Sequence, residues 1–172
     1  EDYKNAVSVF AKAVDLDGAN GVYFNNLGLA HFQQGKYTEA LDNFRTAVGL
    51  DPENANVYFN KGNAELALRQ FDAALDDFDQ AIARDPDDEN TYHAKGIAFQ
   101  NMEPPRILAA IEQFQKALTL NPTFKPSLFH MGLMYHTNNQ TFKALDCFAQ
   151  VAKADPTDRR AFENIGLVYC DL

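Results

Sequence analysis

The stretch FNNLGLAHFQQGKYTEALDNFRTAVGLDP, residues 24–52, carries a pattern that returns through the chain. Its first glycine, Gly28, has counterparts at spacings of 34, 34, 36 and 34 residues, namely Gly62, Gly96, Gly132 and Gly166. A fixed period of this length is typical of solenoids, in which each repeat is one supersecondary unit stacked on its neighbours. The sequence therefore predicts a tandem array.

Other slots of the repeat recur in the same register. A bulky apolar residue stands four positions before the glycine, as Phe24, Tyr58, Tyr92, Leu128 and Phe162. A small residue follows the glycine by twelve positions, with a shift of two in the third repeat, as Ala40, Ala74, Ala110 and Ala144. A later aromatic slot holds Phe10, Phe44, Phe78, Phe114 and Phe148, and the repeats end at Pro52, Pro86, Pro122 and Pro156. Glycine lets two helices approach closely beneath an aromatic ring, and proline cannot continue a helix. Each repeat is thus predicted to be one helical hairpin.

With these slots the chain resembles the tetratricopeptide repeat family over nearly its whole length. The resemblance implies an all-α fold, an α-α superhelix or solenoid of antiparallel helical hairpins. We expect the second helix of a partial repeat at 1–20, full repeats at 21–54, 55–88, 89–124 and 125–158, and the first helix of a further repeat at 159–172. An array normally ends in polar caps, so we expect either a fragment of a longer array or ends covered by another copy.

The composition limits the class of protein. The chain has 172 residues, 46% of them hydrophobic, and a net charge of −9. Nucleic-acid binding needs a basic stripe, so this charge argues against it. No apolar run approaches the length of about 18 residues that a membrane span requires. Cys147 and Cys170 lack a CxxC spacing and are expected to be reduced thiols. We therefore expect an intracellular, cytoplasmic protein that binds neither nucleic acid nor membranes.

Charged residues are expected to lie on solvated surfaces. Many acidic residues belong to the predicted second helices, as do Asp72, Asp76, Asp77 and Asp79. Two slots that are usually apolar in the family hold Lys61 and Lys95, and Glu65 follows Lys61 at i+4. We expect the lysine stems to cover apolar surface while the ammonium groups reach water, with Lys61 and Glu65 forming an exposed pair.

The resemblance also implies a binding surface. In this family one face of every first helix lines a concave groove, and function is sought there. The candidate partner-binding residues on that stripe are Asn25, Asn26, Asn56, Phe59, Asn60, Asn63, Asn90, His93, Phe129, His130 and Asn164. Asn26, Asn60 and Asn164 share one position and resemble an asparagine ladder that grips a peptide backbone, although Ala94 and His130 interrupt it.

Two further slots refine the groove. Consecutive repeats hold Phe59, His93 and Phe129 at one position, where they could anchor a partner or equally pack on neighbouring helices. A carboxylate-binding groove of this family needs lysine and arginine beside asparagine. The slot where a lysine of that kind could stand holds Val22, Asn56, Asn90 and Pro126, so we do not expect binding of chaperone C-termini.

No catalytic constellation emerges from the sequence. The four histidines, His31, His93, His130 and His136, lack metal-ligand spacing, and no glycine-rich phosphate loop is present. We predict no enzyme activity, metal or cofactor, and a protein-interaction scaffold that binds a peptide or helical segment of a partner. Two alternatives remain open. The array could recruit substrates for a larger enzyme such as a glycosyltransferase, or act as an architectural subunit that associates through its open ends.

Overall fold

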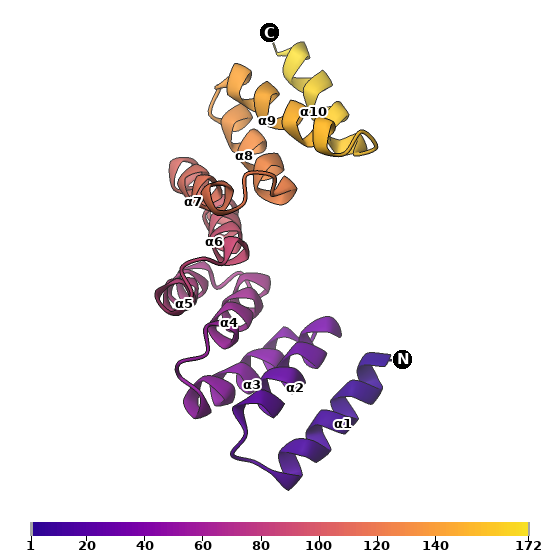
Figure 1. Ribbon diagram of the computed structural model, residues 1–172, viewed down its shortest axis with the longest axis vertical. Coiled ribbons are helices and arrows are strands. Elements are labelled where there is room, and N and C mark those ends of the chain that lie inside the picture. The colour runs from indigo at the N-terminus through magenta and orange to yellow at the C-terminus, as the bar shows by residue number, and fades with distance from the viewer. Residues whose placement is uncertain (1, 172) are drawn as a thin grey trace. The chain divides into compact units, whose positions relative to one another are not determined.

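The computed structural model describes residues 2–171, and this range contains ten α-helices and no strand (Figure 1). The chain divides into two compact units, Glu1–Pro86 (unit 1) and Asp87–Leu172 (unit 2). The helices of unit 1 are α1 Asp2–Leu16, α2 Gly21–Gln33, α3 Tyr37–Leu50, α4 Ala55–Ala67 and α5 Phe71–Arg84. Those of unit 2 are α6 Glu89–Asn101, α7 Ile107–Leu120, α8 Lys125–Thr137, α9 Thr141–Ala154 and α10 Arg159–Cys170. The predicted all-α fold of helical hairpins is confirmed.

Each complete hairpin is closed by a contact between a glycine and a phenylalanine. The pairs are α2 with α3, α4 with α5, α6 with α7 and α8 with α9. In all four, the phenylalanine of the second helix is fully buried and lies directly above the glycine of the first. A Cβ added to the glycine would meet the ring at 2.6 Å (Gly28, Phe44), 2.7 Å (Gly62, Phe78), 2.5 Å (Gly96, Phe114) and 2.8 Å (Gly132, Phe148). The role predicted for the glycine slot is therefore confirmed.

The turns within the hairpins follow local rules. One residue of the turn has a left-handed backbone in three hairpins, with φ of 75° at Gly35, 59° at Arg69 and 56° at Asn139. Glycine adopts this conformation without steric cost, and asparagine tolerates it better than most residues. The third hairpin has a longer turn after α6, which accounts for the shift of two residues in the spacing.

Unit 1 contains a cluster of three charged side chains, two of them buried (Glu65, Asp77) and one half-buried (Lys61), which we call the buried cluster. Lys61 of α4 lies 2.6 Å and 2.8 Å, by its Nζ, from the two carboxylate oxygens of Asp77 on α5. The same Nζ is 3.6 Å from Glu65 Oε1. Glu65 is only 3% exposed and Asp77 6% exposed, and Glu65 Oε2 is buried without a hydrogen-bond partner. The expectation of an exposed Lys61–Glu65 pair, and of Asp77 on a solvated face, is therefore wrong.

The charges of this cluster do not balance if both carboxyl groups ionise, because one ammonium faces two carboxylates. Burial first, and then the hydrogen bond and negative charge of Asp77, raise the pKa of Glu65 to about 8, while Lys61 opposes them. Glu65 therefore keeps its proton at neutral pH and can donate a hydrogen bond to Asp77.

This proton predicts how the stability of unit 1 depends on pH. The folded state holds a proton on Glu65 that the unfolded state releases above its ordinary pKa of 4.5. The free energy of unfolding should then fall by about 1 kcal/mol per pH unit from pH ~5 to ~8. Glu65→Gln should abolish this slope, because its amide is neutral and still donates to Asp77. Urea unfolding at several pH values, followed by NMR signals of unit 1, measures the slope.

The exposed Glu112 serves as the control for this experiment. It belongs to α7 and pairs with Lys116 at 2.9 Å on the surface. Glu112→Gln should leave the slope of unit 1 as in the unchanged protein. A slope that persists in Glu65→Gln would show that another group takes up the proton.

Candidate functional site on the first-helix face

In unit 1 the predicted asparagines lie on α2 and α4, two of them bonded to each other. Asn60 Nδ2 of α4 donates a hydrogen bond of 3.0 Å to Asn25 Oδ1 of α2. The pair is half-buried and joins the two first helices. In this pair the Asn25 amide nitrogen is left as a hydrogen-bond donor and the Asn60 carbonyl oxygen as an acceptor. Asn63 is half-buried on α4, and Asn56 is exposed near the start of that helix.

Asn26 lines a cavity of about 200 Å³ between α1 and α2. The other lining residues of α2 are Leu29, Ala30 and Gln33, and α1 contributes Tyr3, Ala6 and Phe10. The wall is therefore mostly apolar, and Asn26 and Gln33 are its amide groups.

The three aromatic candidates pack against second helices. The ring centroid of Phe59 lies 6.3 Å from that of Phe78. His93 lies 5.5 Å from Phe114, and Phe129 lies 5.7 Å from Phe148. Each candidate is half-buried. Each candidate therefore packs against the phenylalanine that closes its own hairpin, while part of its side chain remains exposed.

Two histidines of unit 2 are held in a neutral state by their surroundings. His93 Nδ1 of α6 is 3.0 Å from Ser127 Oγ, and His130 Nδ1 of α8 is 3.0 Å from Gln100 Oε1. Burial, with the charge of His130 adding to it, lowers the pKa of His93 to about 4. Burial, and secondarily the positive charge of Arg160, lowers the pKa of His130. At neutral pH both imidazoles offer hydrogen bonds and ring surface but no charge.

A cavity of about 210 Å³ opens beside the His130 ring, between α8 and the start of α10. Phe129 and His130 line it, together with the charged side chains of Lys125, Asp155, Asp158 and Arg160. The guanidinium carbon of Arg160 lies 5.0 Å from the centroid of the Phe129 ring. The cavity thus combines an aromatic surface, a neutral imidazole and two ion pairs.

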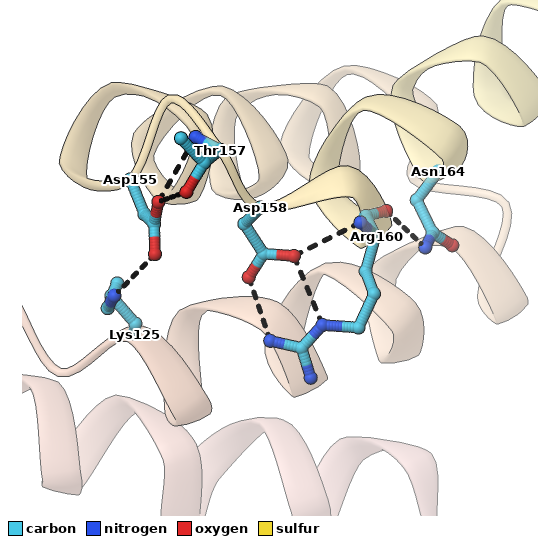
Figure 2. A network of polar contacts seen from close by, with 6 residues as sticks. All are labelled: Lys125, Asp155, Thr157, Asp158, Arg160 and Asn164. Atoms are coloured by element: carbon cyan, nitrogen blue, oxygen red, sulfur yellow. Dashed lines mark hydrogen bonds and ion pairs between the residues drawn. The ribbon is translucent and has the colours of Figure 1, made fainter.

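Arg160 is oriented by the aspartate that caps its own helix. Its Nη2 lies 2.7 Å from Asp158 Oδ2, and its Nε donates to Asp158 Oδ1 at 3.1 Å (Figure 2). Asp158 Oδ1 also accepts from the backbone N–H of Arg160 at 3.0 Å and so caps α10. The guanidinium is therefore fixed in direction although its side chain is exposed.

The second ion pair holds the segment before α10. Lys125 Nζ lies 3.0 Å from Asp155 Oδ2, while Asp155 Oδ1 accepts from the Thr157 hydroxyl at 2.7 Å (Figure 2). The hydrogen bonds from Thr157 and Lys125 lower the pKa of Asp155 to about 2. Asn164 Nδ2 donates to the Arg160 carbonyl at 2.8 Å, within α10 itself.

Residues 25–89 match the family model described as tetratricopeptide repeat. This stretch includes the glycine–phenylalanine contacts of α2 with α3 and of α4 with α5, and unit 2 repeats the same contact twice. Residues 25–89 therefore carry tetratricopeptide repeats (TPRs).

Solved structures share the fold of this chain. MamA from Desulfovibrio magneticus RS-1 is 22% identical with a TM-score of 0.82, over 91% of this chain and 88% of that chain. YrrB, titled a TPR protein with an unusual peptide-binding site, is 23% identical with a TM-score of 0.77, over 96% and 84%. PilF of Pseudomonas aeruginosa is 18% identical with a TM-score of 0.85, over 99% and 78%. No curated protein sequence matches the chain. At these identities the likeness shows the fold, an all-α solenoid.

A TPR fold of this kind is a scaffold for protein–protein interaction, and such folds are in general not catalytic. Over residues 2–171, no three His, Cys, Asp or Glu side chains are grouped as metal ligands. Both cysteines are free, with Cys147 buried and Cys170 exposed. None of the helices described is long and apolar enough to cross a membrane.

The structure brings some of the predicted site residues together and leaves others apart. His93, Phe129 and His130 form one aromatic group, with the ring centroids of His93 and His130 5.5 Å apart and those of Phe129 and His130 5.7 Å apart. Asn90 lies exposed at the start of α6, where its Nδ2 donates to Asp88. The asparagine ladder stays a prediction. Among its members, Asn60 is bonded to Asn25 and Asn164 to its own helix.

Sequence reasoning missed Arg160 and its ion pair with Asp158. Arg160 is the fifth member of the slot that holds Val22, Asn56, Asn90 and Pro126. The sequence did contain a signal, because the same slot one repeat further along holds an arginine at the edge of the groove-facing stripe.

Proposed function

We propose that the first-helix face of unit 2 binds an extended or helical segment of a partner protein, with the cavity beside Phe129 and Arg160 as its main contact. The observation that supports this is the composition of the cavity wall. Aromatic surface, which carries much of the energy in protein interfaces, lies there next to a fixed guanidinium.

The polar groups of this face suit a peptide backbone. Arg160 and Lys125 are paired with aspartates at the surface, where an ion pair contributes little to stability, so both cations can still donate to a partner. In unit 1, the Asn25–Asn60 pair presents a donor and an acceptor in the way a peptide group requires. YrrB, described as a TPR protein with an unusual peptide-binding site, has the same fold and supports the proposal. The free cysteines suit an intracellular, cytoplasmic setting, which is part of the proposal.

Two neighbouring arginines offer a matched test. Arg160 lines the cavity, whereas Arg159 is exposed and forms a long pair of 3.8 Å with Glu163. Peptides selected from a display library against the whole chain should bind Arg160→Ala about tenfold more weakly, because the guanidinium and its stacking on Phe129 are lost. Arg159→Ala removes the same charge and should change the affinity less than twofold. Fluorescence anisotropy measures both.

Equal losses in the two variants would attribute the effect to net charge alone. Peptides that bind the unchanged protein and both variants with one affinity would place the main contact elsewhere. Either result would overturn the role of this cavity.

A further inference from the structure

At three equivalent positions of the repeat, unit 1 carries charged side chains and unit 2 carries largely apolar ones. The buried cluster of unit 1 consists of Lys61, Glu65 and Asp77. The residues 70 positions later, two repeats along, are Met131, Tyr135 and Cys147. In unit 1 the charged side chains at these positions form ion pairs with one another. In unit 2 the side chains at the same positions are largely apolar.

In unit 2 this place is a cavity of about 520 Å³, which we name the α7–α9 cavity. Its buried lining is contributed by Leu118 of α7, Leu128 and Met131 of α8 and Cys147 of α9. Burial raises the pKa of Cys147 to about 12, so the thiol is neutral. The Lys143 ammonium lies over the Tyr135 ring, 5.2 Å from its centroid. The buried lining of the cavity is therefore uncharged, and its residues differ from those of the first-helix face, although α8 contributes to both.

Large apolar side chains are also exposed on the second helices of unit 2. Phe142, which lines the α7–α9 cavity, is 77% exposed, and Leu108 at the same slot of α7 is 69% exposed. The second helices of unit 1 carry Thr38 and Asp72 at this slot. Exposed apolar surface that adjoins a cavity marks an interaction site more often than isolated exposed residues do.

The rim of the cavity carries polar groups that define the charge of the ligand. Asp146 lies on the α9 side, where Gln150 Nε2 donates to Asp146 Oδ2 at 2.8 Å. No other partner of this carboxylate is found within residues 2–171. The lysine of the lining, Lys143, is directed to Tyr135. The Asp146 carboxylate is therefore left without a cation among the described residues, and it favours a cationic group on the partner.

We propose that the α7–α9 cavity binds the apolar face of a basic amphipathic helix from a partner protein. The rim on α9 extends from Phe142 to Gln150, which at the helical rise is about 12 Å, the length of roughly two helical turns. Apolar side chains on one face of such a helix fill the space above Leu118 and Met131. A lysine or arginine beside them pairs with Asp146. This proposal does not rest on binding at the first-helix face.

The test uses the whole chain and a synthetic amphipathic peptide with leucine along one face and lysine along the other. The chain has three methionines, and Met131 lines the cavity whereas Met102 and Met134 do not. With ¹³C-methyl labelling, the Met131 signal should shift on titration while the signals of Met102 and Met134 stay in place. The dissociation constant comes from the same titration.

A pair of charge reversals completes the test. Asp146→Lys should weaken binding about tenfold at low ionic strength. Asp76, the exposed residue at the same slot of unit 1, provides the control, because Asp76→Lys changes the net charge equally and should alter the affinity less than twofold. Equal effects of the two reversals would overturn the proposal. So would a Met131 signal that does not respond to peptide, or one that shifts with protein concentration alone because a second copy fills the cavity.

Discussion

Replacing Lys61 by methionine, the residue that unit 2 carries at the same position of the repeat, is expected to destabilise unit 1 by about 3–5 kcal/mol. The side chain is similar in length, so the change removes the ammonium with little change in packing. Asp77 then loses the cation at 2.6 Å, and Glu65 and Asp77 remain buried together without a counter-charge. Urea unfolding followed by NMR signals of unit 1 measures the loss.

Two companions make the result specific. The triple variant Lys61→Met, Glu65→Tyr, Asp77→Cys installs all three residues of unit 2 and should recover stability to within about 2 kcal/mol of the unchanged protein. Lys116→Met breaks the exposed pair with Glu112 and should cost less than about 0.5 kcal/mol. If Lys61→Met were as mild as Lys116→Met, the buried cluster would not contribute as its geometry indicates.

Gly96→Leu is expected to destabilise unit 2 by about 3 kcal/mol, at the upper end of the penalties for overpacking. A Cβ at Gly96 would lie 2.5 Å from a ring atom of Phe114, and this ring is fully buried. The substitution therefore forces α6 and α7 apart. Thermal unfolding by circular dichroism, together with NMR signals of unit 2, reports the loss.

Gly166 provides a control at the same slot. A Cβ there meets nothing within 4 Å, so Gly166→Leu should stabilise α10 by up to about 0.8 kcal/mol through its higher helix propensity. Opposite signs at the two glycines would show that the ring contact decides the outcome. A loss at Gly166 as large as that at Gly96 would assign the effect to the leucine itself.

The helical hairpins could be predicted because their signals are local or periodic. The glycine, alanine, aromatic and proline slots fix where helices begin, end and cross. The buried cluster of unit 1 could not be predicted in the same way, because charged residues on a helix are usually exposed. A signal did exist in the repeat itself. The positions of Lys61, Glu65 and Asp77 hold Met131, Tyr135 and Cys147 two repeats later, and such apolar counterparts indicate a buried slot.

The candidate site was predicted in part. The aromatic group of His93, Phe129 and His130 follows from their shared stripe. The bond between Asn25 and Asn60 depends on the rotation of α2 against α4, which the repeat pattern does not specify. The cavity beside Arg160 depends on how Asp158 caps α10 and directs the guanidinium. Side-chain pairing of this kind is decided by distances of a few tenths of an ångström, which no periodicity contains.

The glycine–phenylalanine contact also explains how far sequences with this fold can diverge. Each hairpin depends on a ring that leaves no room for a side chain opposite it, so this slot accepts almost no substitution. Most surface positions have no such steric constraint, and the two units carry different residues at equivalent slots. A few strict positions in each repeat are enough to specify the architecture. Identities of 18–24% beside TM-scores of 0.75–0.85 are then an expected result of drift at the remaining positions.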